Sequence, residues 1–311
     1  MKRLTDAEQL MKKNALVARA ILEHGLQWYE IDEAEFYAFM NATEASGTTH
    51  FHCQDAMKYF IRDWSSEGLI EREPTMPCIL SAVEKAFPKD SRFRDSPPKM
   101  LVPGAGLGRL GHEIANLRGF DVTINEWSYH MLLAYHWLQT LEKPNSISFH
   151  PFVDSWSHRT TVASLIREVQ FPDNVDLLSQ SSVNMVDGDF TKVFDSEQGT
   201  FDAVVTLFFL DTARNLLTYL WTIHSMLKPG GVWINHGPLL YRETLALKLT
   251  LEEVILLAEA VGFRFEQPGD QCGQEMEGQP LLRGELVPYQ SDAERLSRNA
   301  YLSQHWVARK L

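Results

Sequence analysis

The chain has 311 residues, of which 44% are hydrophobic, and a formal net charge of −12 at pH 7. This length and apolar content exclude a disordered chain and allow one large domain or two modest ones. A chain this acidic repels a nucleic-acid phosphate backbone unless a local basic patch offsets the charge. The sequence shows no evident basic patch, so nucleic acid is not expected as a partner.

The first residues, the apolar runs and the cysteines predict the compartment. Residues 1–8 lack the apolar core of a secretory signal, and the longest uncharged apolar run, 203–210, is too short to span a bilayer. The cysteines are Cys53, Cys78 and Cys272, whose spacings match neither a disulfide framework nor a zinc motif. We therefore expect reduced thiols, no metal site and no membrane partner in a cytosolic protein that is small enough to reach the nucleus.

Residues 1–98 are predicted to form an N-terminal helical region. Apolar residues recur at helical spacing over 11–26, over 57–64 and again after Pro77. The proline-containing run 92–98 then interrupts the pattern.

Residues 99–311 are predicted to form a second domain of the α/β class, in which strands and helices alternate. Such alternation indicates a parallel sheet with helices on both faces, closed by an antiparallel last strand. The segments 143–182 and 267–300 are long insertions, which are usually either functional or disordered. The strands are expected at 100–103, 121–125, 183–187, 202–208, 231–235, 263–266 and 305–309, and the helices at 109–118, 128–141, 213–227 and 251–261.

The stretch 100–109 is typical of a strand, a tight glycine turn and a helix start. Gly104, Gly106 and Gly108 alternate with other residues, which lets the backbone approach a nucleotide-like ligand closely. Glu126 ends the second strand, where its carboxylate can accept hydrogen bonds from both ribose hydroxyls. A dinucleotide site normally shows G-x-G-x-x-G, so the G-x-G-x-G spacing favours a ligand without phosphate, S-adenosylmethionine.

Two later strands end in residues with two open interpretations each. Asp189 and Phe190 suit the edge and face of an adenine, or else form a capped turn whose aromatic ring is in the core. Asp211 ends a strand at the edge of the sheet where ligands bind in such folds, or else caps the helix that follows.

Seven motifs together resemble the carnosine N-methyltransferase family, from about Gln54 to the C-terminus. The resemblance implies a seven-stranded, Rossmann-like methyltransferase sheet preceded by a helical region. It also implies methyl transfer from S-adenosylmethionine to the imidazole of carnosine, which yields anserine and S-adenosylhomocysteine. The motifs are Phe60–Gly68, Val102–Leu110, Asn125–Ser128, Gly188–Phe190, Phe208–Ala213, Leu227–Gly231 and Trp233–Tyr241.

The resemblance also implies roles for individual residues. Asp211 would be catalytic, because a carboxylate that accepts the imidazole N–H directs the lone pair of the other nitrogen at the methyl group. Tyr289 and Tyr301 would face the substrate, although Tyr301 can equally be core packing. The cofactor would be bound by Arg62, Gly104, Glu126, Asp189 and Phe190, with Gly106 in the same turn.

Three positions depart from the family pattern. Arg242 stands where the resemblance implies a substrate-side histidine, Asn299 stands in the tyrosine cluster, and Tyr59 replaces a glutamine. Arg242 is interpreted either as a partner of a substrate carboxylate or as a solvated arginine at a helix start. Alternatives to carnosine methylation are therefore a protein or peptide histidine as acceptor, and a scaffold that binds S-adenosylmethionine without turnover. A homodimer is also allowed, because relatives can dimerise.

Overall fold

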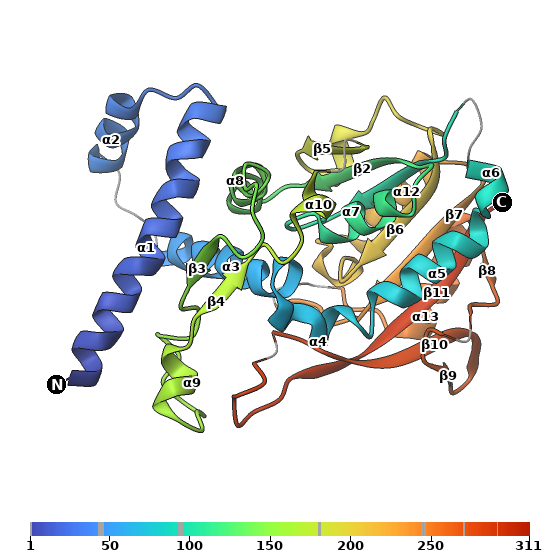
Figure 1. Cartoon of the computed structure of the whole chain (residues 1–311). Helices are drawn as coiled ribbons and strands as arrows, with labels where there is room; N and C mark the ends of the chain where they lie inside the picture. Colours follow the sequence, from blue (N-terminus) through green and yellow to red (C-terminus); the bar gives the residue numbers. More distant parts are fainter. Residues whose placement is uncertain are drawn as a thin grey trace. The chain divides into compact units, whose positions relative to one another are not determined.

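A computed structural model describes residues 2–42, 47–92, 96–179, 182–243, 245, 247–269, 271–290 and 292–311 (Figure 1). The chain forms two compact units, each made of segments that are distant in sequence. This grouping differs from the linear division at residue 98, because parts of both expected insertions belong with the N-terminal helices. Unit 1 is Met1–Ile70, Ser128–Ser179 and Gln290–Asn299, and unit 2 is Glu71–Trp127, Gln180–Tyr289 and Ala300–Leu311.

Unit 2 is built on a nine-stranded sheet. Its strands are β1 (Lys99–Pro103), β2 (Asp121–Glu126), β5 (Val183–Asp187), β6 (Phe201–Leu207), β7 (Leu227–Gly237), β8 (Phe263–Glu266), β9 (Gln274–Met276), β10 (Gln279–Pro288) and β11 (Ala300–Lys310). The order is β5-β2-β1-β6-β7-β11-β10-β9, and β8 also pairs with β11. The strands from β5 to β7 run parallel, and β11 is antiparallel to β7. The α/β class and the antiparallel closing strand are thus confirmed.

The seven strands expected from the sequence are all present, but the expected number of strands is too low. The extra strands β9 and β10 form a hairpin within the expected insertion 267–300. Most side chains of this hairpin are exposed or half-buried, so the segment lacks the apolar alternation that identifies a strand.

Helices cover both faces of this sheet. On one face lie α5 (Met76–Ala86) and α7 (Arg109–Asn116), and α7 approaches so closely that a Cβ on Gly111 would lie 2.2 Å from Ile124. On the other face, α11 (Phe190–Val193), α12 (Leu216–Met226) and α13 (Leu251–Val261) enclose a core with Leu101, Val204 and Trp233. The carboxyl ends of the parallel strands therefore emerge between two helical layers.

Unit 1 is mainly helical. It contains α1 (Lys2–Trp28), α2 (Glu33–Ala42), α3 (Gly47–Trp64), η1 (Ser66–Gly68), α8 (Tyr129–Leu138), α9 (Val162–Ile166), α10 (Val175–Leu178) and the antiparallel pair β3 (Ile147–Phe149) and β4 (Val169–Phe171). Trp28 of α1 stacks on His136 of α8 with ring centroids 4.2 Å apart. Among the described helices, none combines the length and the hydrophobicity needed to cross a bilayer.

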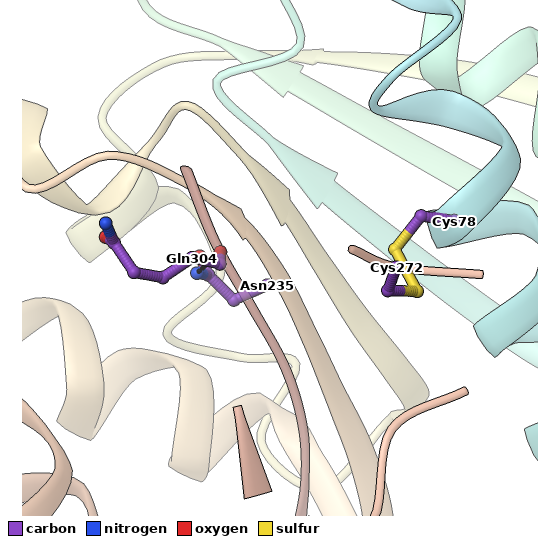
Figure 2. Close-up of a disulfide and its surroundings, with 4 residues drawn as sticks. All are labelled: Cys78, Asn235, Cys272 and Gln304. Carbon is purple, nitrogen blue, oxygen red and sulfur yellow. Dashed lines mark hydrogen bonds between the residues drawn. A yellow bond between two sulfur atoms is a disulfide. The ribbon is translucent and has the colours of Figure 1, made fainter. Parts of the chain in front are cut away.

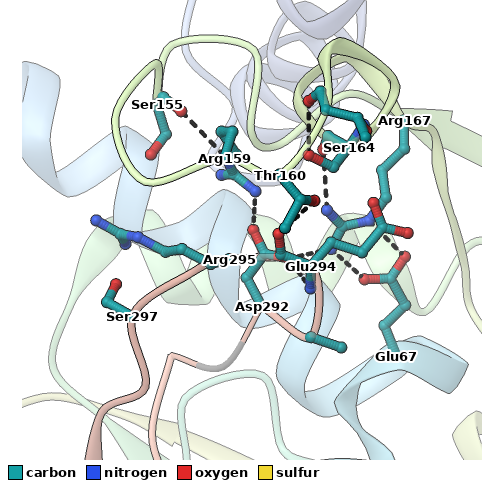
Figure 3. A network of polar contacts seen from close by, with 12 residues as sticks. Glu67, Ser155, Arg159, Thr160, Ser164, Arg167, Asp292, Glu294, Arg295 and Ser297 are labelled. Atoms are coloured by element: carbon teal, nitrogen blue, oxygen red, sulfur yellow. Dashed lines mark hydrogen bonds and ion pairs between the residues drawn. The ribbon is translucent and has the colours of Figure 1, made fainter.

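An ion-pair network joins three distant segments of unit 1 (Figure 3). The Asp292 carboxylate pairs with Arg159 and with Arg167, whose Nη2 also lies 2.8 Å from Oε2 of Glu67. Both guanidinium groups lie over the Phe152 ring, at 4.8 and 3.9 Å from its centroid. Burial favours a higher pKa for Asp292, but hydrogen bonds from Arg167 and from the Glu294 N–H, together with the charges of both arginines, outweigh it and lower the pKa.

The change Asp292→Asn is expected to lower the free energy of unfolding by about 2 kcal/mol, because two poorly exposed guanidinium groups lose their shared anion. Urea denaturation at pH 7 measures the effect. The exposed Glu294→Gln carries the same change of charge and should stay within about 0.5 kcal/mol of wild type. The folded-state pKa of Asp292 is lowered, so its contribution is present above the unfolded pKa of about 3.9 and disappears as the pH falls through the folded value. Equal destabilisation by both variants would contradict the prediction.

Candidate functional site

The glycine turn after β1 has the tight, left-handed backbone conformation that its glycines allow. Gly104, Gly106 and Gly108 have φ values of 64°, 58° and 79°, in the left-handed region that favours glycine. A Cβ on Gly104 would also lie 2.5 Å from the ring of Phe209. The tight turn between strand and helix is therefore confirmed, and it needs glycine for both conformation and space.

Glu126, at the end of β2, holds this turn in place. One carboxylate oxygen accepts the Gly106 N–H at 2.9 Å, and the other accepts the Trp127 N–H at 2.7 Å. The Gly188 N–H, just beyond β5, donates to the Glu126 carbonyl at 3.0 Å. The residue therefore links the glycine turn with the carboxyl ends of β2 and β5.

Asp189 and Phe190 follow β5, and the structure gives each a local role. Asp189 caps α11, with Oδ1 accepting the N–H of Thr191 at 3.0 Å and its hydroxyl at 2.8 Å. Burial favours a higher pKa for Asp189, but these hydrogen bonds and the charge of Lys192 lower the pKa. Phe190 is 4% exposed and meets Phe209 edge-on at 5.4 Å. The capped turn with a core aromatic is thus observed, and cofactor binding by both residues stays a prediction.

Tyr219 of α12 is a site residue that the sequence analysis missed. Its ring stacks on Phe209 with centroids 4.7 Å apart. Burial raises the pKa of its hydroxyl, and the negative charges of Asp189 and Glu126 raise it further, whereas a hydrogen bond from Thr212 lowers it. Both carboxylates of the predicted cofactor side thus act electrostatically on this hydroxyl group. The available signal was an aromatic residue in the first turn of the helix that follows Asp211.

Asp211 lies in the short helix η2 (Leu210–Thr212), just beyond β6. Its Oδ2 accepts the Leu240 N–H at 3.1 Å. Burial raises the pKa of Asp211 to about 6, against a smaller opposing effect of backbone hydrogen bonds. The helix-capping alternative is wrong, because Asn215 caps α12 and accepts the Thr218 N–H at 3.3 Å. Asp211 is thus a largely desolvated carboxylate at the end of the sheet where ligands bind.

Three half-buried aromatic rings form a cluster next to this strand end, which we call the aromatic cluster: Phe208, Tyr289 and Tyr301. Phe208 stacks on Tyr289 with centroids 5.3 Å apart, and Tyr301 lies 5.2 Å from Tyr289. Phe208 has a φ of 51°, which is uncommon for a residue with a side chain and recurs at functional sites. The structure therefore unites the two predicted tyrosines with a phenylalanine three residues before Asp211.

Tyr241 and Arg242 follow β7 and have different environments. The Tyr241 hydroxyl is buried, and burial, followed by the charges of Asp211 and Glu253, raises its pKa to about 12 against a smaller opposing effect of the Leu249 backbone. Tyr241 therefore lies near Asp211, whereas in the sequence it stands out only as the last residue of the motif Trp233–Tyr241. Arg242 is exposed and lies in the irregular segment before α13. It therefore does not start a helix, because α13 begins after its N-cap residue Thr250.

Arg62 and Asn299 belong to unit 1. The Arg62 guanidinium pairs with Asp63, Nε to Oδ1 at 2.7 Å, and lies 4.0 Å from the centroid of the Tyr59 ring. The departure at Tyr59 thus packs directly against Arg62, whose role in cofactor binding stays a prediction. Asn299 is exposed.

The expectation of reduced thiols is wrong for two cysteines. Cys78 of α5 and Cys272, in the loop before β9, form a disulfide across 194 residues of sequence (Figure 2). Both residues are 2% exposed. Their pairing depends on the packing of α5 against the sheet, so their spacing in the sequence did not reveal it. The side chain of Cys53 lies outside the described residues.

A family model and individual relatives of this chain point to the same protein family. A family model for carnosine N-methyltransferase matches residues 41–311. The chain is 39% identical over 222 residues to the carnosine N-methyltransferase of Rattus norvegicus, which covers 68% of this chain and 54% of that protein. It is 32% identical over 286 residues to that of Schizosaccharomyces pombe, covering 85% of this chain and 74% of that protein. The chain spans about half the length of the rat relative. Because the family model matches most of its residues, the chain belongs to the carnosine N-methyltransferase family.

Proposed function

We propose that the protein transfers a methyl group from S-adenosylmethionine to an imidazole nitrogen of carnosine, yielding anserine and S-adenosylhomocysteine. The observation that carries this proposal is the desolvated Asp211 carboxylate, three residues from the aromatic cluster at the end of β6. Membership of the carnosine N-methyltransferase family supports the same reaction.

The turn at Gly104–Gly108 and Glu126 supports S-adenosylmethionine as the methyl donor. The three glycines of the turn have no side chains and adopt positive φ angles, so the carboxylate and amino group of the ligand can approach their backbone. A carboxylate has about four acceptor positions, so the two backbone hydrogen bonds of Glu126 are compatible with bonds from ribose hydroxyls. When bound, the cofactor supplies an electrophilic methyl group.

Asp211 would orient the acceptor. With a pKa of about 6, it is mostly ionised at pH 7 and can accept the imidazole N–H, which fixes the tautomer and directs the other nitrogen at the methyl group. A neutral imidazole is already nucleophilic near pH 7, so no strong base is needed. The ring becomes cationic after transfer, and the same carboxylate stabilises that charge.

The aromatic cluster and Tyr241 complete the proposed acceptor side. Tyr289 and Tyr301 offer ring faces that can stack on an imidazole. The buried Tyr241 hydroxyl can donate a hydrogen bond to the acceptor or to Asp211. Exposed Arg242, next in the chain, can pair with the carboxylate of a dipeptide.

The test is a transfer assay with purified protein, methyl-labelled S-adenosylmethionine, and carnosine, homocarnosine or a histidine-containing peptide. We expect label on carnosine, at a ring nitrogen identified by mass spectrometry and comparison with anserine. Label found only on the peptide would show that the methyl acceptor is a peptide histidine and not the dipeptide. Label on none of them, with S-adenosylmethionine still bound in calorimetry, would support the non-catalytic scaffold.

A further inference from the structure

His236 and His305 form an unusual pair inside the sheet of unit 2. They are directly opposite each other on β7 and β11, with ring centroids 5.7 Å apart, and both are 0% exposed. Among the described residues, none of their four ring nitrogens has a partner within normal hydrogen-bond distance and angle, although the Asn235 backbone lies close enough to the His305 ring to interact with it. Buried polar atoms almost always have a partner, so four such nitrogens in one place require an explanation, of which a bound ion is one.

Cys78 meets this pair from α5. Its sulfur and one nitrogen from each histidine all lie within 4.8 Å of one another. The Cys272 sulfur is bonded to that of Cys78, so an opened disulfide places a fourth donor atom beside the group (Figure 2). Tetrahedral zinc has ligand atoms about 3.3–3.8 Å apart, so side-chain rotations that draw these atoms about 1 Å closer assemble the site.

Arg283 adds a charge that suits anionic ligands. It is 6% exposed and lies directly opposite His305 in the pairing of β10 with β11. Its hydrogen bonds go to the carbonyls of Pro280 and Leu282, and it has no carboxylate partner among the residues that the structure describes. A buried cation beside His305 is compensated when the two cysteines of the group bind metal as thiolates, because each thiolate carries a negative charge.

We propose that the reduced protein binds one Zn²⁺ through Cys78, Cys272, His236 and His305. Four nitrogen and sulfur ligands with tetrahedral spacing are the donor set that zinc prefers, whereas calcium and magnesium require oxygen. All four residues belong to unit 2. Four protein ligands also close the coordination shell, so the zinc is structural.

The disulfide is the metal-free, oxidised form of the same two sulfurs. A dithiol reductant supplies two electrons and two protons to open the S–S bond, producing two cysteine thiols and the oxidised cyclic disulfide of the reductant. Zinc binding then displaces one proton from each thiol. In the reverse direction, a disulfide oxidant takes two electrons from the two thiolates and leaves as a dithiol, so the S–S bond forms again and the ion is released.

The zinc site would also hold the part of β7 that contacts Phe208 of the aromatic cluster. The carbonyl of His236 accepts the N–H of Phe208 at 2.9 Å, and Phe208 holds the left-handed conformation at the end of β6. A zinc bound to His236 thus restrains the strand segment against which Phe208 is positioned.

The test measures the zinc content of the full chain after reduction with dithiothreitol, incubation with Zn²⁺ and removal of loosely bound ion under anaerobic conditions. We expect about one zinc per chain, and protection of Cys78 and Cys272 from a thiol reagent. Cobalt in place of zinc should give the intense visible bands of a tetrahedral site and a thiolate charge-transfer band. Less than about half an equivalent of zinc, or full reactivity of both thiols in the zinc-loaded protein, would overturn the proposal.

Four variants distinguish this site from adventitious binding. Cys272→Ser and His305→Gln should each weaken zinc binding more than about tenfold, since even residues outside the ligand shell change metal affinity by that factor. Cys53→Ser and His224→Gln remove the same residue types elsewhere and should bind zinc like wild type. If His305→Gln fails to fold, as judged by circular dichroism, the nearly isosteric Cys272→Ser carries the comparison. Equal zinc binding by Cys272→Ser and Cys53→Ser would refute the site whatever the methyl acceptor proves to be.

Discussion

Asp211→Asn is expected to lower kcat for carnosine about 10²- to 10³-fold, while the Kd for S-adenosylmethionine changes less than about threefold. Asparagine keeps the shape of the side chain, and its amide oxygen can still accept the Leu240 N–H that Asp211 accepts at 3.1 Å. It removes the negative charge that orients the imidazole and stabilises the cationic product. Steady-state kinetics at saturating cofactor, together with calorimetric titration of S-adenosylmethionine, measure the two effects separately.

The pH dependence gives this prediction a second readout. Wild-type kcat should fall as the pH drops through about 6, because Asp211 acts in its ionised form and burial raises its pKa to about 6. Asp211→Asn should lack that decrease in kcat, while kcat/KM of both enzymes still reports the free imidazole near pH 6.5. The exposed Asp195→Asn is the matched control and should leave kcat within about twofold of wild type. An unchanged kcat in Asp211→Asn would remove Asp211 from the mechanism.

Glu126→Gln is expected to weaken the binding of S-adenosylmethionine about 100-fold, equivalent to about 2.7 kcal/mol. The carboxylate accepts hydrogen bonds from the N–H groups of Gly106 and Trp127, at 2.9 and 2.7 Å. Glutamine offers one oxygen acceptor, so its amide N–H₂ would face one of these donors, and hydrogen bonds to a charged group are worth about 1.5–3 kcal/mol each. Isothermal titration calorimetry measures the Kd.

The kinetic pattern of Glu126→Gln should be the reverse of that of Asp211→Asn. At saturating S-adenosylmethionine its kcat should recover to within about threefold of wild type, because Glu126 positions the cofactor and does not contact the acceptor in the proposed mechanism. Glu252→Gln changes an exposed carboxylate on α13 and serves as the control for loss of one charge. A normal Kd combined with a low kcat would show that Glu126 acts on the chemical step instead.

Local sequence was sufficient for the elements whose burial pattern is strong. The apolar run of β1, the alternating glycines and the start of α7 are encoded within eleven residues, and the structure reproduces them. The hairpin β9–β10 and the pair β3–β4 were not predicted, because they depend on pairing with a neighbouring strand and show little apolar alternation. Tertiary contacts thus determine the elements that local patterns do not.

In the candidate site, too, some residues could be identified from local sequence and others only from the folded structure. Gly104 and Glu126 could be selected from spacing alone, since a turn and the strand beside it are close in the chain. Tyr219 and Tyr241 could not, because their importance arises from the carboxylates that the folded sheet brings near them. Asn215, only four residues after Asp211, is the residue that caps α12. The sequence alone did not show which of the two residues is the cap, because that depends on the backbone conformation between them.

The position of β11 has a consequence for synthesis of the protein. This strand follows all the others along the chain, yet it lies inside the sheet, between β7 on one side and β8 and β10 on the other. While a nascent chain leaves the ribosome, β7 and β10 therefore present unpaired edges until residues 300–310 emerge, and such edges recruit other chains. Premature termination before residue 300 should consequently appear as aggregation and clearance by proteases, even though the glycine turn and Asp211 have already been translated.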